Sequence, residues 1–172
     1  DPEALKLLVK SLLDRDVRLS LDATALVSYI LPLLSGKNVV VTPHAGEFKK
    51  MFGEAPPDSK KARITMVEKF AKDHSITILL KGPTDIISNG TKTYINPTNT
   101  PGMTVGGTGD ILSGIIAGML ARNRNALESA VISAYFNGLA GKSTQKKLGS
   151  HMTATDLLDA LPSVMKSFDK IK

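Results

Sequence analysis

The segment Gly106-Gly107-Thr108-Gly109-Asp110 places three glycines and one carboxylate directly before a long apolar run. Glycines let several backbone N–H groups point the same way, and a following helix adds its positive end, so the loop is suited to bind an anion. Asp110, in the first helical turn, would be close enough to take a proton from a hydroxyl that attacks a phosphorus atom. The alternative is a glycine-rich turn in which Asp110 only caps the helix, which contributes about 1 kcal/mol.

A second group of candidates follows the apolar, β-branched run at 38–42. His44 and Glu47 come just after this run, and ligands of open α/β sheets bind at the carboxyl ends of the strands. His44 would hydrogen-bond a substrate, and Glu47 would position water or a metal ion near phosphate. The alternative is that His44 is a surface loop residue and Glu47 a first-turn acid that faces the helix dipole.

A third group lies at Lys81-Gly82-Pro83-Thr84, directly after the apolar run ITILL. Gly82 lets the backbone turn sharply, so Lys81, Thr84 and nearby backbone groups would share one rim. Such a rim suits the phosphate or ribose of a nucleotide. A lysine that merely ends a strand is the alternative, and the residues of this segment leave both interpretations open.

Strand and helix patterns alternate along the chain and would hold these three groups. Alternating or continuous apolar runs predict strands at 17–22, 38–42 and 76–81, and Asn89-Gly90 predicts a hairpin between two further strands. Buried strands separated by helices predict a three-layer α/β/α fold, with a mostly parallel central sheet and an antiparallel hairpin. Helical periodicity is present at 1–13, 23–35 with an interruption at Pro32, 46–52, 60–73, 109–122, 125–147 and 153–170 with a break at Pro162.

Two glycines in the predicted helix after Asp110 lie four residues apart, at Gly114 and Gly118. Small side chains at this spacing share one helix face, so we expect another element to pack closely there. The chain also begins with a helix and has few strands for a parallel sheet. We therefore expect an N-terminal part of the fold to be missing from it.

The composition is that of an ordinary globular protein, with 172 residues, 42% of them hydrophobic, and no cysteine. One domain over residues 1–172 is expected, and the lack of cysteine and of a long apolar run favours a cytoplasmic protein without a membrane segment. The net charge is +6. Because its lysines and arginines are scattered and few aromatic residues accompany them, we expect no nucleic-acid partner, only a mild preference for anionic small molecules.

Taken together, the motifs resemble one known family. The stretches TPHAGEF, KGPTDII, NTPGMTVGGTGDILSGIIAGMLA and ATDLLDALP occur in this order, and LDATAL precedes them. The chain resembles the ADP- or ATP-dependent NAD(P)H-hydrate dehydratases, a family of the ribokinase-like superfamily, over essentially its whole length. Two positions differ from the usual family pattern: Asp22-Ala23-Thr24-Ala25-Leu26-Val27 lacks a second acid and an asparagine, and Asn137-Gly138 replaces a His-Gly pair.

The resemblance implies that ADP or ATP phosphorylates the C6 hydroxyl of hydrated NADH or NADPH, after which elimination of phosphate restores the reduced nicotinamide. It implies Asp110 as the base, an anion hole at Gly107, Thr108 and Gly109, and Mg²⁺ to shield the nucleotide. His44 and Asp110 match hydrate-binding positions, and Glu47 matches an acid that acts indirectly on the metal. The positions that match nucleotide-binding residues are Lys81, Gly82, Pro83, Thr84, Asp85 and Gly109.

The resemblance also implies a longer domain than this chain, because the family's early segment carries part of the hydrate site. The sequence leaves open a homo-oligomer and an upstream epimerase domain as further partners. Two other functions remain open from the sequence: a small-molecule kinase of the same superfamily, acting on a sugar or vitamin precursor, and a nucleotide-binding remnant without catalysis. The combination of TPHAGE with PGM favours the dehydratase over the kinase.

Overall fold

Strands and helices alternate along the chain, for which a computed structural model describes residues 1–122 and 125–169. The strands are β1 (Leu19–Leu21), β2 (Val39–Val41), β3 (Thr77–Leu80), β4 (Asp85–Ser88) and β5 (Thr93–Asn96). The α-helices are α1 (Pro2–Asp14), α2 (Leu31–Leu34), α3 (Ala45–Phe52), α4 (Lys60–His74), α5 (Thr108–Ala121), α6 (Ala126–Leu148) and α7 (Ala154–Lys166). Short 3₁₀ turns are η1 (Ala23–Ala25), η2 (Ser28–Ile30), η3 (Pro101–Thr104) and η4 (Gly149–His151).

The strands form one sheet in the order β1-β2-β3-β4-β5. The first three are parallel, whereas β4 and β5 run antiparallel and make the predicted hairpin. The hairpin turn depends on Gly90, which has φ +82° and whose added Cβ would lie 2.5 Å from the backbone of Lys72 in α4. A mainly parallel sheet ending in a hairpin confirms the predicted fold class.

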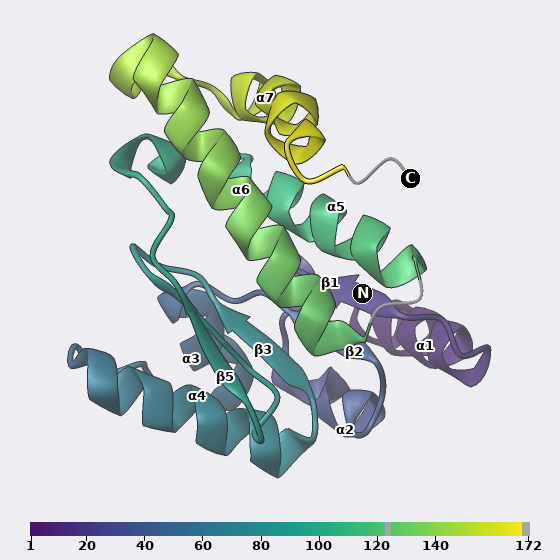
Figure 1. Cartoon of the computed structure of the whole chain (residues 1–172). Helices are drawn as coiled ribbons and strands as arrows, with labels where there is room; N and C mark the ends of the chain where they lie inside the picture. The colour runs from purple at the N-terminus through teal and green to yellow at the C-terminus, as the bar shows by residue number, and fades with distance from the viewer. Residues whose placement is uncertain (123–124, 170–172) are drawn as a thin grey trace.

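Helices cover both faces of this sheet (Figure 1). On one face, α1, α2, α3 and α4 pack on an apolar cluster that includes Val39 and Val41, and on the other face α5 and α6 pack around Val40. This alternation follows from the strand geometry, because successive side chains point to opposite faces. Helix α7 packs mainly against α6, on the far side from the strands (Figure 1).

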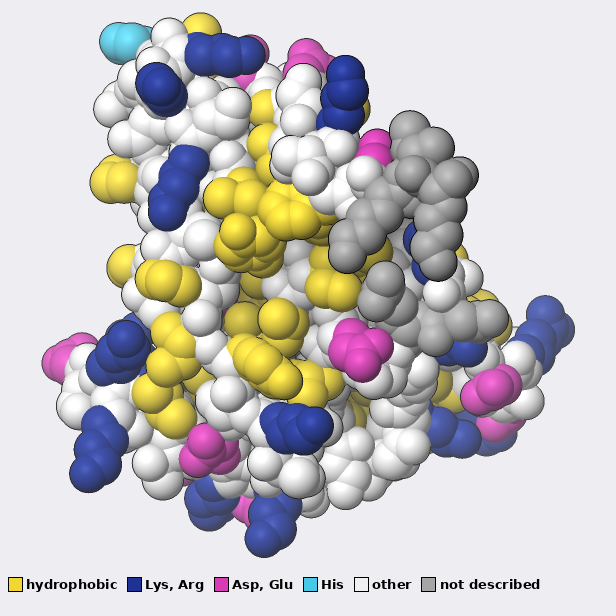
Figure 2. Space-filling model, viewed as in Figure 1, with side chains coloured by type: hydrophobic (Ala, Val, Ile, Leu, Met, Phe, Trp, Pro, Cys, Tyr) yellow, Lys and Arg dark blue, Asp and Glu magenta, His cyan; other side chains and the backbone are white. Residues whose placement is uncertain are grey.

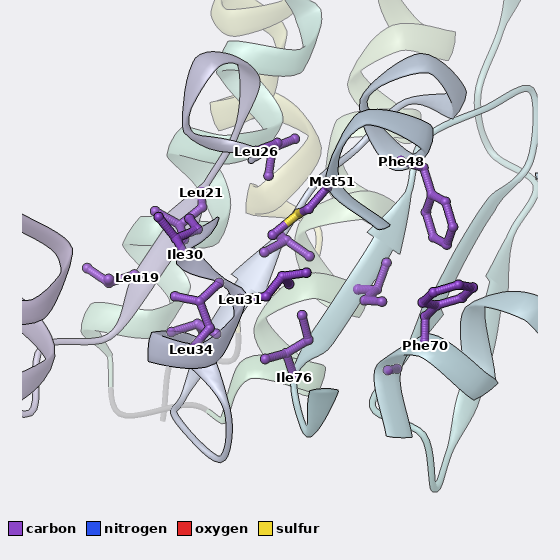
Figure 3. Packing of buried hydrophobic residues seen from close by; sticks show 14 of the residues in the cluster. Leu19, Leu21, Leu26, Ile30, Leu31, Leu34, Phe48, Met51, Phe70 and Ile76 are labelled. Carbon is purple, nitrogen blue, oxygen red and sulfur yellow. The ribbon is translucent and has the colours of Figure 1, made fainter. Parts of the chain in front are cut away.

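The segment between β1 and β2 differs from the single interrupted helix expected at 23–35. It forms η1, η2 and the four-residue helix α2. This segment brings Leu26, Ile30 and Leu34 into the same apolar cluster as Met51 (Figure 3). Burial of these side chains, each with no exposed surface, outweighs the weak local preference for a longer helix. Pro32 lies in the first turn of α2, where a proline is tolerated.

Two further expectations about helices were wrong. Helix α7 continues through Pro162 to Lys166, although a break was expected there. Pro162 is exposed, so the carbonyl that its ring leaves unbonded, that of the half-exposed Leu158, can be hydrated. In α5, nothing lies within 4 Å of a Cβ added at Gly114 or Gly118, so these glycines are not packing positions in the described structure.

The surface carries the excess positive charge without a dominant stripe on the face in view. Figure 2 shows lysine and arginine side chains spread around the rim of this face, with hydrophobic side chains gathered nearer its centre. None of the helices in the described part of the chain is sufficiently long and apolar to span a bilayer.

Candidate active site

The carboxyl ends of the three parallel strands meet at one edge of the sheet and bring together charged residues from distant parts of the chain. Asp22 follows β1, Glu47 lies in the first turn of α3 after β2, and Lys81 follows β3. Lys81 Nζ lies 2.7 Å from Asp22 Oδ1 and 3.6 Å from Glu47 Oε2. The three side chains are only 11 to 20% exposed, so their charges interact in partly shielded surroundings.

The glycine loop opens directly onto this charged cluster. Gly107, with φ +94°, is the N-cap of α5, and Thr108, Gly109 and Asp110 form its first turn. A Cβ on Gly109 would lie 3.3 Å from Lys81 Nζ and 3.6 Å from Asp22 Oδ2. The first backbone N–H groups of a helix have no partner within the helix, so here they provide donors for an anion next to the lysine ammonium.

The side chain of Thr108 is hydrogen-bonded within the glycine loop and its approach. Its hydroxyl donates to the backbone oxygens of Met103, at 2.8 Å, and Val105, at 3.1 Å. The hydroxyl therefore closes the loop on itself, and what Thr108 offers to an anion is its backbone N–H.

Asp110 is exposed at the mouth of the loop. Within the described residues its carboxylate makes no hydrogen bond or ion pair, unlike the acids at the same position of α3 and α7. The described residues therefore show no capping hydrogen bond from Asp110, and its role as a proton acceptor stays a prediction.

His44 and Glu47 form a capping box at the start of α3. His44 Nδ1 accepts the backbone N–H groups of Gly46 at 3.0 Å and Glu47 at 3.2 Å, while Glu47 Oε2 accepts the backbone N–H of His44 at 2.9 Å. Because Nδ1 is an acceptor, the geometry assigns the imidazole proton to Nε2. His44 Nε2 lies 3.6 Å from Glu47 Oε2, and the imidazole, with its side chain 59% exposed, lies at the rim of the site.

Lys81 and Gly82 are held in place by the strands on either side. The backbone N–H of Lys81 donates to the oxygen of Pro43 at 2.8 Å, which ties the loop after β3 to the loop after β2. The backbone N–H of Gly82 donates to Asp85 Oδ1 at 3.2 Å. Pro83 is exposed and Thr84 is half-buried, so the tip of this loop faces solvent next to the ion pair.

Asp85 lies beneath the loop rather than on its surface, with 3% of the residue exposed. Its oxygens also accept hydrogen bonds from Asn96 Nδ2 at 3.0 Å and Asn99 Nδ2 at 2.8 Å. Burial raises the pKa of the Asp85 carboxyl, and the hydrogen bonds from Asn96, Asn99 and Gly82 oppose that rise. Asp85 therefore organises the loop from within the protein.

Three residues of this site, Asp22, Asn96 and Asn99, were not among the functional residues predicted from the sequence. Asp22 had a usable signal, because it directly follows a strand as Lys81 does, but it was noted only as part of a family motif. Asn96 and Asn99 had no such signal, since their link to Asp85 depends on the hairpin register and the return of the chain after β5.

The acidic residues suit a magnesium ion that takes most of its ligands from water and phosphate. Mg²⁺ in nucleotide enzymes is bound by one or two carboxylates plus phosphate oxygens. Glu47 Oε1 accepts no hydrogen bond among the described residues, so it can hold a water ligand of the ion. The described residues contain no cluster of three or more His, Asp or Glu side chains that would hold a metal without a nucleotide.

A cavity of about 690 Å³ lies elsewhere, at the amino ends of β2 and β3. Lys37, Lys72, Asn89 and Asn125 are among the residues that line it. None of the predicted site residues does, and the chemistry argued above concerns the opposite edge of the sheet.

Comparisons with known proteins place the chain in a family. The family model for NAD(P)H-hydrate dehydratase matches residues 1–163. The ADP-dependent (S)-NAD(P)H-hydrate dehydratase of Nitrosopumilus maritimus is 64% identical over 171 residues, which are 99% of this chain and 60% of the relative. The bifunctional NAD(P)H-hydrate repair enzyme of Archaeoglobus fulgidus is 39% identical over 98% of this chain and 34% of its own length.

A solved structure agrees with this placement. The ADP/ATP-dependent NAD(P)H-hydrate dehydratase of Bacillus subtilis, co-crystallised with ATP and Mg²⁺, has a TM-score of 0.79 and 30% identity over 90% of this chain and 56% of that one. The chain thus spans about 60% or less of the length of these relatives. With the family model matched over most of its residues, the chain belongs to the NAD(P)H-hydrate dehydratase family.

Proposed function

We propose that this protein catalyses the ADP- or ATP-dependent dehydration of NAD(P)H hydrate to NADH or NADPH. The observation that carries the proposal is that Lys81 Nζ lies beside Gly109 in the first turn of α5, the turn that also carries Asp110, in a chain of this family. An ammonium and unpaired backbone N–H groups provide for a phosphoryl group, and an exposed carboxylate provides for a proton.

In the proposed reaction the C6 hydroxyl oxygen bonds to the terminal phosphorus of the nucleotide, and the bond from that phosphorus to the bridging oxygen breaks. The hydroxyl proton passes to Asp110. Phosphate then leaves C6 with the electron pair of the C–O bond, and the neighbouring ring carbon loses a proton to water, which restores the carbon–carbon double bond. The backbone N–H groups of Thr108 and Gly109, with the Gly107 turn that presents them, stabilise the charge on the transferring group.

The remaining side chains of the edge orient the two substrates. The Nε2–H of His44 donates to the hydrate, and the loop Lys81-Gly82-Pro83-Thr84 contacts the nucleotide, with Asp85 supporting that loop from below. Bound Mg²⁺ would neutralise phosphate charge, and Glu47 would hold one of its waters.

We also propose where the reaction takes place and which further domain accompanies it. A metabolite-repair enzyme of this kind would act in the cytoplasm, where the nicotinamide cofactors are used. The relative from Archaeoglobus fulgidus is bifunctional and longer than this chain, which supports a partner domain, such as an epimerase, for the same repair pathway. Residues 1–172 would form one domain in this arrangement.

The proposal is tested by supplying NADH hydrate or NADPH hydrate with Mg²⁺ and either ADP or ATP, and following recovery of the reduced-nicotinamide absorbance. The relative from Nitrosopumilus maritimus serves as positive control. Asp110→Asn is expected to lower kcat by about 10²- to 10⁴-fold, because it removes the proton acceptor, and to change the nucleotide Kd little.

A matched control removes a carboxylate from the same helix position elsewhere. Glu128 is the third residue of α6, is exposed, and lies away from the site, so Glu128→Gln should leave kcat unchanged. Unchanged turnover in Asp110→Asn would remove Asp110 from the role of base. Phosphorylation of a sugar without recovery of NADH would contradict the proposed reaction itself.

A further inference from the structure

The ion pair between Asp22 and Lys81 joins two strand ends that are 59 residues apart in the sequence. Asp22 Oδ1 accepts a hydrogen bond from Lys81 Nζ at 2.7 Å, within the short range of charge-assisted bonds. The side chains of Asp22 and Lys81 are 11% and 20% exposed, so this pair is less screened than an ordinary surface pair. Its geometry therefore fixes where the ammonium lies.

The Lys81 ammonium lies close to a second positive group, the N-terminal turn of α5. The first turn of a helix carries partial positive charge, which repels a cation. Lys81 Nζ nevertheless lies 3.3 Å from the Cβ position of Gly109 in the first turn of α5. Asp22 Oδ2 lies 3.6 Å from the same position, so the carboxylate offsets the repulsion where the two positive groups meet.

Glu47 is the other carboxylate near Lys81, but it is a weaker partner. Its Oε2 is 3.6 Å from Lys81 Nζ and already accepts the backbone N–H of His44. Asp22 is therefore the group that sets the direction of the ammonium.

We propose that Asp22 is a positioning residue for nucleotide binding, which acts through Lys81 and not by touching the reacting atoms. It holds the ammonium beside the backbone N–H groups of α5 before a nucleotide arrives. The phosphate oxygens of a nucleoside di- or triphosphate then meet all these donors at once, and less ordering is needed on binding. This inference rests on the nucleotide dependence in the proposed function.

The test measures binding of Mg–ADP and Mg–ATP to the protein by calorimetry, without any need for turnover. Four forms are compared: wild type, Asp22→Asn, Lys81→Met and the double variant. Asp22→Asn should raise the nucleotide Kd about 10-fold, the order of effect of one charge-assisted hydrogen bond. The double variant should match Lys81→Met within about 2-fold, because Asp22 has no route to the nucleotide once Lys81 is gone.

Two further variants separate positioning from stability. Asp22→Glu keeps the charge and should recover part of the affinity. Asp14→Asn breaks the exposed Lys10–Asp14 pair on α1 and should leave the nucleotide Kd unchanged. Thermal unfolding of each variant shows that the protein compared is folded.

A second measurement does not depend on nucleotide at all. The side-chain ammonium of a firmly hydrogen-bonded lysine gives an observable ¹H–¹⁵N signal, and that of Lys81 should be present in wild type and absent in Asp22→Asn. Persistence of this signal in the variant would overturn the inference.

The binding data distinguish the two proposals. If wild type binds neither nucleotide, the proposed function fails and the inference fails with it. If wild type binds but Asp22→Asn weakens binding by the same factor with and without Lys81, only the inference fails. That last result would mean that Asp22 acts on the ligand independently of Lys81, for example as a metal ligand.

Discussion

Asp85 and Asp110 carry the same side chain but differ in what surrounds it. Asp110 is exposed, whereas Asp85 is 3% exposed and accepts three hydrogen bonds beneath the loop at 81–84. An exposed carboxylate can exchange a proton with a ligand, and a buried one with all its bonds satisfied serves to fix backbone. Burial therefore separates a candidate base from a supporting residue.

Asp85→Asn is expected to lower the free energy of unfolding at pH 7 by about 1–3 kcal/mol, measured by urea unfolding. An amide at this position would present N–H donors to Asn96 Nδ2, itself a donor. Asn96 cannot simply turn over, because its Oδ1 accepts the hydroxyl of Thr98 at 2.6 Å.

The same variant should reveal the raised pKa of Asp85. An acid whose pKa is higher in the folded state contributes most stability below its unfolded pKa, here 3.8, and this contribution is lost as the pH rises through the folded pKa. The stability advantage of wild type over Asp85→Asn should therefore increase as the pH falls from the folded pKa of Asp85 to its unfolded pKa of 3.8.

Asp156 gives a control of opposite sign. A side-chain hydrogen bond from Thr153 lowers the pKa of Asp156, so the advantage of wild type over Asp156→Asn should shrink as the pH falls below 3.8. Parallel pH profiles for the two variants would contradict the assignment for Asp85.

The glycines of α5 and α6 differ in how closely other parts of the protein approach them. Gly114 and Gly118 in α5 face open space, whereas a Cβ on Gly138 in α6 would lie 1.7 Å from Thr98 Oγ1 and 3.1 Å from its backbone carbon. The close approach of α6 to the chain after β5 holds in place the segment that includes Asn96 and Asn99, and through them Asp85. Helix α6, which carries none of the predicted site residues, thus supports the loop at 81–84.

Gly138→Ala should lower the free energy of unfolding by about 1–3 kcal/mol, because the added methyl group forces the backbone near Thr98 to move. It should also weaken nucleotide binding, since that backbone supports the loop at Lys81. Denaturant unfolding and calorimetry measure the two effects.

The matched control is the same change in the open face of α5. Gly114→Ala meets nothing within 4 Å and should raise stability by about 0.5–1 kcal/mol through a better helix propensity. Similar losses from both substitutions would mean that close packing at Gly138 is not what matters.

Across the whole molecule, the site depends on strands, helices and loops from most of the sequence meeting at one sheet edge. A ligand that binds this edge would therefore stabilise the folded state as a whole. Mg–ADP or Mg–ATP at 100 times its Kd should add about 2.7 kcal/mol to the free energy of unfolding. For a chain of this size that corresponds to a rise in Tm of about 5–10 °C.

Chelation of Mg²⁺ with EDTA should remove most of this rise in Tm, because the phosphate charges are then neutralised only by Lys81 and the backbone N–H groups. Lys81→Met should also reduce it. A rise in Tm that is the same with and without EDTA would exclude a role for the metal in nucleotide binding.

Local patterns in the sequence were sufficient for the order and type of most elements. The strands, the Asn89-Gly90 hairpin and the glycine loop before α5 were predicted because they depend on side-chain periodicity and on turn residues that are close together in the chain. The segment at 23–35 was not, since burial of Leu26 and Ile30 decided its turns.

The contacts that complete the site depend instead on the folded arrangement. Asp22 reaches Lys81 because the parallel register of β1, β2 and β3 brings their carboxyl ends to one edge. Asp85 is buried and Asp110 exposed because helices cover one position and leave the other open. Pairing and burial join residues far apart in the chain, and short-range periodicity carries no information about which of them will meet.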